Sequence, residues 1–316
     1  MDRLHLASQH CTSSLDPASQ STKIDIIGIQ MDFGASIRGV NMGPLAIRHA
    51  GLQAGLEQLG FDVKDKGDII PSQSKETGEA QLKYCSQICG ANKELHNEVA
   101  KTLQQKHLPL VLGGDHSISA GSISAARQII GDIGVIWVDA HGDFNNEYSS
   151  PTGNMHGMPL SALCGMGPRV MVDFTHEIPY IDPQKVVLVG VRELDPPEKM
   201  RMKQAGLKVF TMSDIDRLGI ATVMEQAIAA ASAGTKGIYV SYDLDAISPP
   251  DAPGVGTPIP NGLTVREAFL VAESLAATGK IIGLDIVEVN PMLDICNKTG
   301  ELACHLALAL LGKTVY

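Results

Sequence analysis

The 316-residue sequence has no apolar run approaching the roughly 20 residues that a membrane-spanning helix needs. It also has no dense cluster of lysine and arginine, and its formal net charge is −10. An acidic chain without a basic patch is not expected to bind nucleic acid or an anionic membrane. The first residues do not form a charged and then apolar leader with a cleavage site, so we expect a protein that is not secreted.

A disulfide framework is missing as well. The six cysteines are scattered over the chain, unlike the closely spaced cysteines of small secreted domains. Cys85 and Cys89 stand four residues apart in a predicted helix, where packing is their expected role. This distribution predicts a reducing, cytoplasmic setting.

Short apolar runs alternate with longer helical patterns. The predicted strands cover residues 24–29, 108–114, 133–141, 185–191, 207–212, 237–245 and 281–290. Predicted helices cover residues 43–59, 93–106, 118–130, 221–234 and 264–279. Continuous hydrophobicity in the strands and their alternation with helices predict an α/β fold, in which helices cover both faces of a parallel sheet. We expect one domain over residues 23–316, preceded by a Ser- and Gln-rich flexible tail over residues 1–22.

Two long stretches, residues 145–159 and 246–262, lack the pattern of a helix or a strand. Loops of this length inside a compact domain are usually functional or else disordered. Each follows a predicted strand that ends in acidic residues. Because sites in open parallel sheets collect at the carboxyl ends of strands, both loops are expected to lie beside a site.

Three predicted strands end in potential metal ligands. Side chains alternate along a strand, so ligands two residues apart point to the same side. A single Asp-x-Asp pair at a strand end is more often a solvated turn than a ligand pair. Together, however, four carboxylates at one edge repel one another unless cations neutralise them. The predicted metal ligands are His116, Asp139, His141, Asp143, Asp243 and Asp245.

The donor types indicate which metal these residues hold. Carboxylates with a minority of imidazoles and no thiolate suit Mn²⁺, and less well Zn²⁺, Co²⁺ or Ni²⁺. Six ligands are too many for one tetrahedral ion, but they suit two ions about 3.5–4 Å apart that share carboxylates and a bridging hydroxide. The small residues Ala140 and Gly142 are expected to leave room for this centre.

Successive motifs resemble those of the arginases, within the manganese-dependent ureohydrolase family. They are GGDHS, DAHGDFN, TGNMHGMP, SYDLDAISPPDAPGVGTP and LDIVEVNP, and the resemblance runs from residue 27 to residue 313. Bacterial-type arginases are the most similar. The resemblance implies a three-layer α/β/α fold with a central, mostly parallel sheet of eight strands, and assembly into homo-trimers or homo-hexamers.

The resemblance also implies ligand roles. One ion is expected to be held by His116, Asp139, Asp143 and Asp243. The other is expected to be held by His141, Asp139, Asp243 and Asp245. Asp139 and Asp243 would then bridge two Mn²⁺ ions per chain.

The implied reaction is hydrolysis of L-arginine to L-ornithine and urea by a metal-bridging hydroxide. Glu288 matches the carboxylate that grips the guanidinium, and His156 matches the proton shuttle to the leaving amine. With Asp143, these are the predicted catalytic residues. The predicted substrate-binding residues are Asn145 and Thr152 for the α-carboxylate, Asp195 and Glu198 for the α-ammonium, and Thr257 near the metals.

Three alternatives remain open at this point. Another ureohydrolase would act on agmatine, a guanidino acid or formimidoylglutamate; arginine is favoured because agmatinases usually carry different residues across the 145–159 loop. A deacetylase-like amidohydrolase would hold a single zinc ion. A catalytically silent binding protein would keep the fold without the reaction.

Overall fold

The computed structural model describes residues 22–175, 178 and 180–314. The predicted N-terminal tail, residues 1–22, lies outside the described residues except for Thr22. The division into this tail and a single domain over residues 23–316 therefore stays a prediction.

A sheet of eight strands, all parallel to their neighbours, forms the centre of the molecule. The strand order is β2-β1-β3-β8-β7-β4-β5-β6. The strands are β1 (Lys23–Ile29), β2 (Asp62–Ile69), β3 (Leu108–Leu112), β4 (Gly134–Val138), β5 (Val186–Val191), β6 (Lys208–Thr211), β7 (Ile238–Asp243) and β8 (Ile281–Val287).

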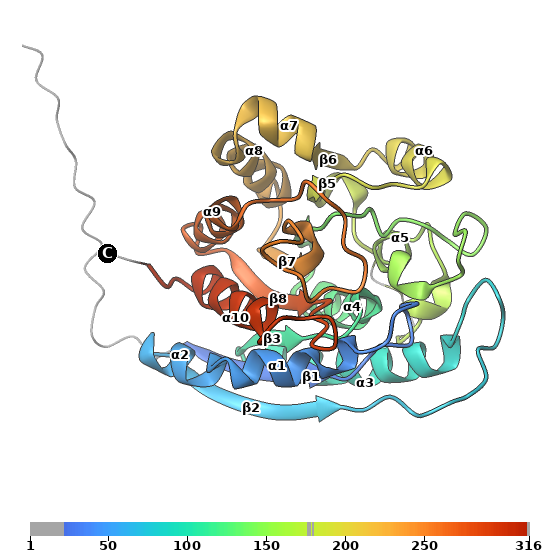
Figure 1. The fold of residues 1–316 in the computed structure, drawn as a ribbon, viewed down its shortest axis with the longest axis horizontal. Helices are drawn as coiled ribbons and strands as arrows, with labels where there is room; N and C mark the ends of the chain where they lie inside the picture. The colour runs from blue at the N-terminus through green and yellow to red at the C-terminus, as the bar shows by residue number, and fades with distance from the viewer. Residues whose placement is uncertain (1–21, 176–177, 179, 315–316) are drawn as a thin grey trace, which may run out of the picture.

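Helices cover both faces of this sheet. They are α1 (Gly43–His49), α2 (Leu52–Gln58), α3 (Cys85–Gln104), α4 (Ser119–Ile130), α5 (Pro159–Leu163), α6 (Pro196–Ala205), α7 (Met212–Leu218), α8 (Ile220–Ser232), α9 (Val265–Ala276) and α10 (Lys298–Leu310). Figure 1 shows α8, α9 and α10 on one side of the sheet and α4, α5 and α6 on the other.

Alternate side chains of each strand enter two separate cores. On β4, Ile136 and Val138 belong to the core shared with α8, α9 and α10, whereas Val135 and Trp137 belong to the core shared with α3, α4 and α5. Every residue of β4 is buried, which is why its sequence is hydrophobic without alternation. The predicted three-layer α/β/α fold is confirmed.

Several local features differ from the predictions, and α6, α7 and α10 were not predicted. β2 was not predicted, because it is an edge strand rich in charged residues, a common protection against strand addition. The helix predicted over residues 43–59 is two helices, separated at Gly51, whose φ of 89° interrupts the helical backbone. The helix predicted at Cys85 and Cys89 and the helix predicted over residues 93–106 are one helix, α3.

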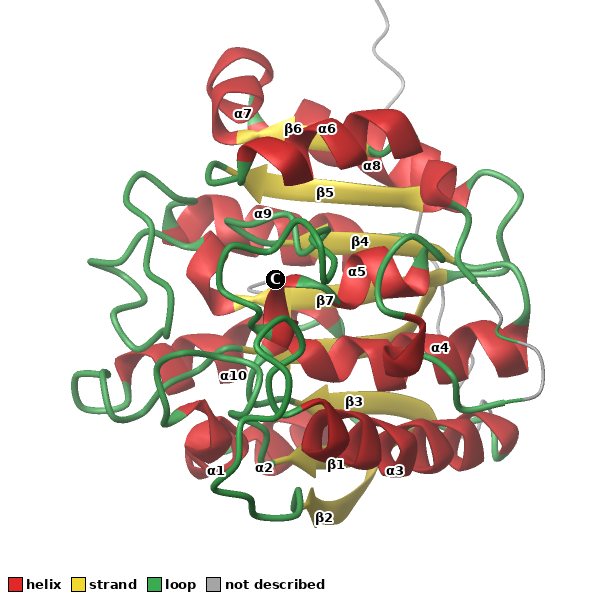
Figure 2. Cartoon of the chain, turned by 90° about the vertical axis from the view of Figure 1, so that its right-hand side faces the viewer, coloured by secondary structure: helices red, strands yellow, loops and turns green. Residues whose placement is uncertain are grey.

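The strand order brings distant motifs together. β3, β8, β7 and β4 are consecutive at the centre of the sheet, although they are the third, eighth, seventh and fourth strands of the chain. In Figure 2 the arrows of β3 and β5 point the same way, and loops gather beyond their heads. All predicted ligands follow these central strands at their carboxyl ends.

Within the described residues, none of the helices combines the length and the hydrophobicity that crossing a membrane requires.

Candidate metal centre and substrate pocket

The first group of ligands surrounds His116. This residue opens a short 3-10 turn after β3, and its side chain is 1% exposed. Its Nδ1 atom lies 3.1 Å from a carboxylate oxygen of each of Asp139, Asp143 and Asp243. Ligand atoms of His116, Asp139 and Asp243 all lie within 4.8 Å of one another, so this group can hold a metal ion.

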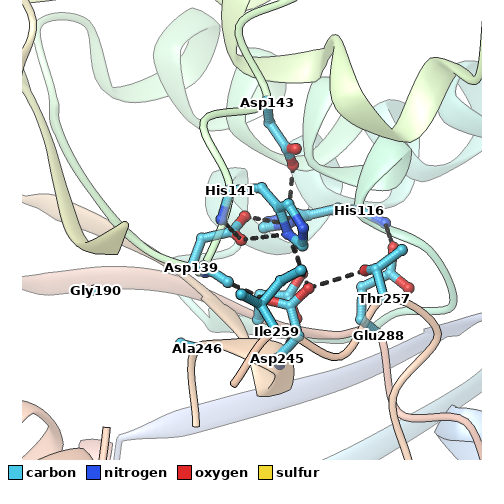
Figure 3. A network of polar contacts seen from close by, with 12 residues as sticks. His116, Asp139, His141, Asp143, Gly190, Asp245, Ala246, Thr257, Ile259 and Glu288 are labelled. Carbon is cyan, nitrogen blue, oxygen red and sulfur yellow. Dashed lines mark hydrogen bonds and ion pairs between the residues drawn. The ribbon is translucent and has the colours of Figure 1, made fainter. Parts of the chain in front are cut away.

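The second group of ligands surrounds His141. Its Nδ1 atom lies 3.0 Å from Asp245 Oδ2 and 3.4 Å from Asp139 Oδ1. Asp139 therefore offers one oxygen to each group, as expected of a bridging ligand. Figure 3 shows Asp139 and Asp143 on either side of the two histidines, with Asp245 below them. The structure brings all six predicted ligands together, while the bridging role of Asp243 stays a prediction.

The pKa values in this cluster show the need for positive charge. Burial disfavours the charged imidazole of His116, yet the three surrounding carboxylates hold its pKa well above the usual range. Burial, together with the neighbouring Asp245 and Asp139, raises the pKa of Asp243 well above its usual value. Burial and Asp139 also raise the pKa of Asp143, to about 6. Without cations, the cluster can relieve its repulsion only by taking up protons.

Neighbouring groups orient these ligands. The Trp137 indole N–H donates to Asp139 Oδ2 at 2.8 Å, and its ring stacks on His116 with 4.0 Å between the centroids. His116 Nε2 lies 2.8 Å from the Ser241 hydroxyl, which leaves Nδ1 facing the carboxylates. The Thr257 hydroxyl donates to Asp245 Oδ2 at 3.0 Å. Such contacts determine which imidazole nitrogen and which carboxylate oxygen face a metal.

Glu288 and His156 form a separate pair beside the ligands. Glu288 Oε1 accepts the His116 backbone N–H at 2.9 Å and lies 3.1 Å from His156 Nδ1. Glu288 Oε2 is buried and has no hydrogen-bond partner among the described residues. The Glu288 backbone has a φ of 64°, in the left-handed region that non-glycine residues rarely adopt. A strained residue with an unpaired buried oxygen is typical of a site that receives a ligand.

The contact between these two side chains determines the protonation of His156. Burial disfavours the imidazolium, but the hydrogen bond to Glu288 and nearby carboxylates raise the pKa of His156 to about 9. Because its pKa is raised, His156 stays protonated at neutral pH and loses its proton only as the pH rises through about 9.

We therefore expect an NMR titration of the metal-free protein to show His156 titrating near pH 9. Glu288→Gln removes the negative charge and should shift this titration toward 6.5, the ordinary histidine value. His305→Ala, which removes an exposed histidine from α10, is the control. An unshifted His156 titration in Glu288→Gln would show that Glu288 does not cause the raised pKa.

Five of the six predicted metal ligands line a cavity of about 330 Å³, and only Asp139 lies behind them. All five predicted substrate-binding residues line it, together with His156 and Glu288. Asn145 Nδ2 donates to Asp195 Oδ2 at 2.9 Å, which links the residues assigned to the two ends of an amino acid. Thr152 is exposed, and its Oγ1 accepts the Asn154 backbone N–H at 3.2 Å.

Comparison with known proteins agrees with this geometry. A family model described as "Arginase family" matches residues 22–312. Arginases from Bacillus caldovelox and Bacillus subtilis (strain 168) are 45% and 44% identical over 293 and 290 residues, which cover 92% of this chain and 98% of each relative. The native structure of the Bacillus caldovelox arginase at pH 5.6 matches with a TM-score of 0.90 and 44% identity, over 93% of this chain and 100% of that one.

The chain belongs to the arginase family.

Membership of the arginase family confirms the predicted fold and the predicted ureohydrolase class. The alternative of a deacetylase-like enzyme with a single zinc ion is set aside. The two ligand groups that share Asp139 agree with this outcome.

One prediction about the ligand motif was wrong in this arginase-family chain. Gly142 was expected to leave room for the metal centre. A Cβ atom at Gly142 would instead meet Leu194, Met202 and Glu198, at 2.6 to 2.9 Å. Gly142 therefore makes room for the side chains of α6 and of Leu194 just before it.

Glu198 has a structural contact that the sequence did not indicate. Its two carboxylate oxygens accept the backbone N–H groups of Phe144, at 2.8 Å, and Asp195, at 3.3 Å. It forms a capping box with Asp195 at the start of α6. Burial raises its pKa to about 7. Any contact with an α-ammonium group is thus added to this capping role.

The sequence analysis missed several residues of the cavity wall. Ser36 accepts a 2.6 Å hydrogen bond from Asn154, and both residues line the cavity. Asp115 is fully buried, and its Oδ2 accepts the Gly34 backbone N–H at 2.8 Å, which ties residues 34–37 to the end of β3. Asn154 could have been predicted, because it stands two residues after Thr152 in the same motif. Ser36 could not, because its loop reaches the cavity only through tertiary contacts.

Proposed function

We propose that this chain hydrolyses the guanidinium group of L-arginine, forming L-ornithine and urea, with two Mn²⁺ ions held by the six ligands. The observation that carries the proposal is the position of the unpaired Glu288 Oε2 in the same cavity as both ligand groups. The names of the relatives support the substrate.

The residues fit two manganese ions. The four carboxylates and two imidazoles form an oxygen-rich donor set, which Mn²⁺ suits better than ions that prefer sulfur. Asp139, Asp243 and Asp245 are at most 2% exposed, so their charges need compensation within the protein. When bound, two divalent ions supply hydroxide near neutral pH by lowering the pKa of water.

Glu288 is proposed to hold the guanidinium. Its Oε1 accepts the His116 backbone N–H, whereas Oε2 has no hydrogen-bond partner in the part of the chain that the structure describes. A guanidinium N–H can donate to Oε2 in a strong, charge-assisted hydrogen bond. This contact would place the guanidinium carbon beside the ligands and hold its orientation during attack.

His156 is proposed to donate a proton to the leaving amine. In the metal-free protein, the hydrogen bond to Glu288 raises the pKa of His156 and so favours the protonated imidazole that proton donation requires. The hydrogen bond to Glu288 holds the ring close to the guanidinium site. Asp143, the third proposed catalytic residue, lies 3.1 Å from His116 and faces the same cavity.

Asn145 and Thr152 are proposed to bind the α-carboxylate, and Asp195 with Glu198 the α-ammonium. Asp195 already accepts a hydrogen bond from Asn145, so one polar network can contact both ends of the substrate. Thr257 is proposed to lie near the metals, where its hydroxyl donates a hydrogen bond to Asp245. We also propose a cytoplasmic location. We propose assembly into a homo-trimer or homo-hexamer, and light scattering can measure the mass of that assembly.

The test is urea release from L-arginine and from agmatine in the presence of Mn²⁺. Agmatine has no carboxylate, so the groups assigned to the carboxylate would lose their partner. A site built to hydrogen-bond a substrate group discriminates against the analogue lacking it by up to roughly 10⁴–10⁵. Because Thr152 is exposed to water, we expect a smaller preference for arginine, at least about 10²-fold in kcat/KM.

Asp195→Ala provides the matched variant. It should raise KM for arginine and keep the bound metals, because Asp195 contacts Asn145 and none of the ligands. Comparable kcat/KM for agmatine, or faster turnover of a short guanidino acid, would support another ureohydrolase activity instead. Absence of activity on every substrate would support the silent binding protein.

A further inference from the structure

A pair of thiols lies outside the proposed catalytic site. Cys85 is the first residue of α3, and Cys89 follows one turn later, with 3.7 Å between their Sγ atoms. Both are partly exposed free thiols. Cys164 and Cys304 are buried, so this pair is the accessible cysteine cluster among the described residues. The core packing expected from the sequence is present, since both contact the core beside α3, but it covers them only in part.

The two thiols differ in reactivity. The hydrogen bond from Cys89 lowers the pKa of Cys85 to about 7, although burial and Glu79 oppose this effect. The start of a helix also favours a thiolate. Burial and the neighbouring Cys85 raise the pKa of Cys89. Cys85 is thus suited to attack a disulfide, and Cys89 to act second.

A second cavity gives access to Cys85, the outer thiol of the pair. It has a volume of about 570 Å³, and residues 76–79 and 84–87 form most of its wall. Its volume is in the range of pockets that hold small molecules. A low-molecular-weight disulfide can therefore reach Cys85 from solvent.

We propose that Cys85 and Cys89 form a reversible disulfide with small disulfides, and that this bond weakens substrate binding in the cavity beside the metal ligands. The second part rests on the proposed arginine hydrolysis; the first part does not.

The exchange is balanced. The Cys85 thiolate attacks one sulfur of the small disulfide and releases a thiolate, leaving a mixed disulfide on Cys85. Cys89 then attacks the Cys85 sulfur, and its proton accompanies the second small thiol that leaves. Two protein thiols are oxidised and one small disulfide is reduced to two thiols.

Closing the bond must change the first turn of α3. Cβ atoms four residues apart on a helix are about 5–6 Å apart. A disulfide needs Cβ atoms about 3.5–4.5 Å apart. Because Cys85 is the first helical residue, it can move when the hydrogen bond from Ile88 N–H to Tyr84 C=O, 3.0 Å long, is broken.

The residues just before Cys85 contact two walls of the substrate cavity. The Tyr84 ring packs on Phe33, with 5.1 Å between centroids, and on the Arg38 guanidinium at 4.9 Å. Phe33 and Arg38 flank residues 35–37, which form part of the cavity wall. The Lys83 backbone N–H donates to Gly153 C=O at 3.1 Å, next to Thr152. Movement of Tyr84 and Lys83 would therefore displace both walls.

The experiment treats the full-length, Mn²⁺-loaded protein with glutathione disulfide. Intact mass should fall by two hydrogen atoms, and peptide mapping should join Cys85 to Cys89. KM for arginine should rise about threefold to tenfold, as for the weakening of roughly one hydrogen bond, and a thiol reductant should restore it. Cys89→Ser should retain one bound glutathione instead of losing two hydrogens. Cys296→Ser, which removes an exposed cysteine in the turn before α10, should respond like the natural protein.

Each outcome decides one part of the proposal. Failure to form the Cys85–Cys89 bond would overturn it entirely. Bond formation with an unchanged KM would overturn the effect on the cavity. If no form of the protein releases urea, the proposed arginine hydrolysis fails, while the mass measurement still decides whether the disulfide exists.

Discussion

Exhaustive chelation is expected to abolish urea release from L-arginine, and added Mn²⁺ to restore it better than Zn²⁺, Co²⁺ or Ni²⁺. The physical reason is the donor set, which contains four carboxylates and two imidazoles and no sulfur. Without cations, His116 stays charged and burial with like charges favours the protonated form of Asp243. The test measures urea release and metal content on the same protein after chelation and dialysis.

Fully active protein should contain about two ions per chain, the number that the two-metal mechanism requires. Asp243→Ala should reduce activity more than Asp143→Ala, since a bridging carboxylate serves both ions. One ion per chain at full activity would contradict the binuclear centre. Equal and mild effects of the two substitutions would count against the bridging role of Asp243.

Replacing His156 by alanine is expected to lower kcat by about 10- to 10⁴-fold, the range for one positioned acid–base group. His156 is the proposed proton donor, and in the metal-free protein its contact with Glu288 raises its pKa to about 9. Metal content should stay at the natural level, because His156 contacts Glu288 and none of the proposed ligands. Steady-state kinetics and metal analysis on the same sample measure both effects.

His305→Ala is the control, because His305 is exposed on α10. Its kcat should match that of the natural protein. A near-natural kcat in His156→Ala would remove His156 from the mechanism and leave the metal assignment unaffected. Loss of metal together with activity would instead assign His156 a role in holding the centre together.

The candidate metal ligands could be picked out from the sequence, because they stand in short motifs at the ends of predicted strands. Asp139, His141 and Asp143 follow β4 at intervals of two residues, and their side chains gather although the backbone there is no longer a strand and Asp143 has a φ of 48°. Asp243 is the last residue of β7, and Asp245 follows it in a short 3-10 turn. The resemblance to the arginases added Glu288, whose Oε2 has no partner among the described residues.

Other features were missed because they depend on distant parts of the chain. The charged β2 has no hydrophobic run, and only its position at the sheet edge makes it a strand. Gly142 looked like a spacer for metals, but its neighbours are Leu194, Met202 and Glu198. The partial exposure of Cys85 and Cys89 depends on how α3 packs, which their spacing in the sequence does not reveal.

The sequence by itself determined the ligand types, their spacing along each strand, and the family to which the chain belongs. Only the tertiary structure decided that β3, β8, β7 and β4 are neighbours, that Asp139 faces both histidines, and that Asn145 contacts Asp195. The physical reason is that periodicity records which face of an element is buried, whereas strand order and contacts between loops depend on how whole helices and strands pack together.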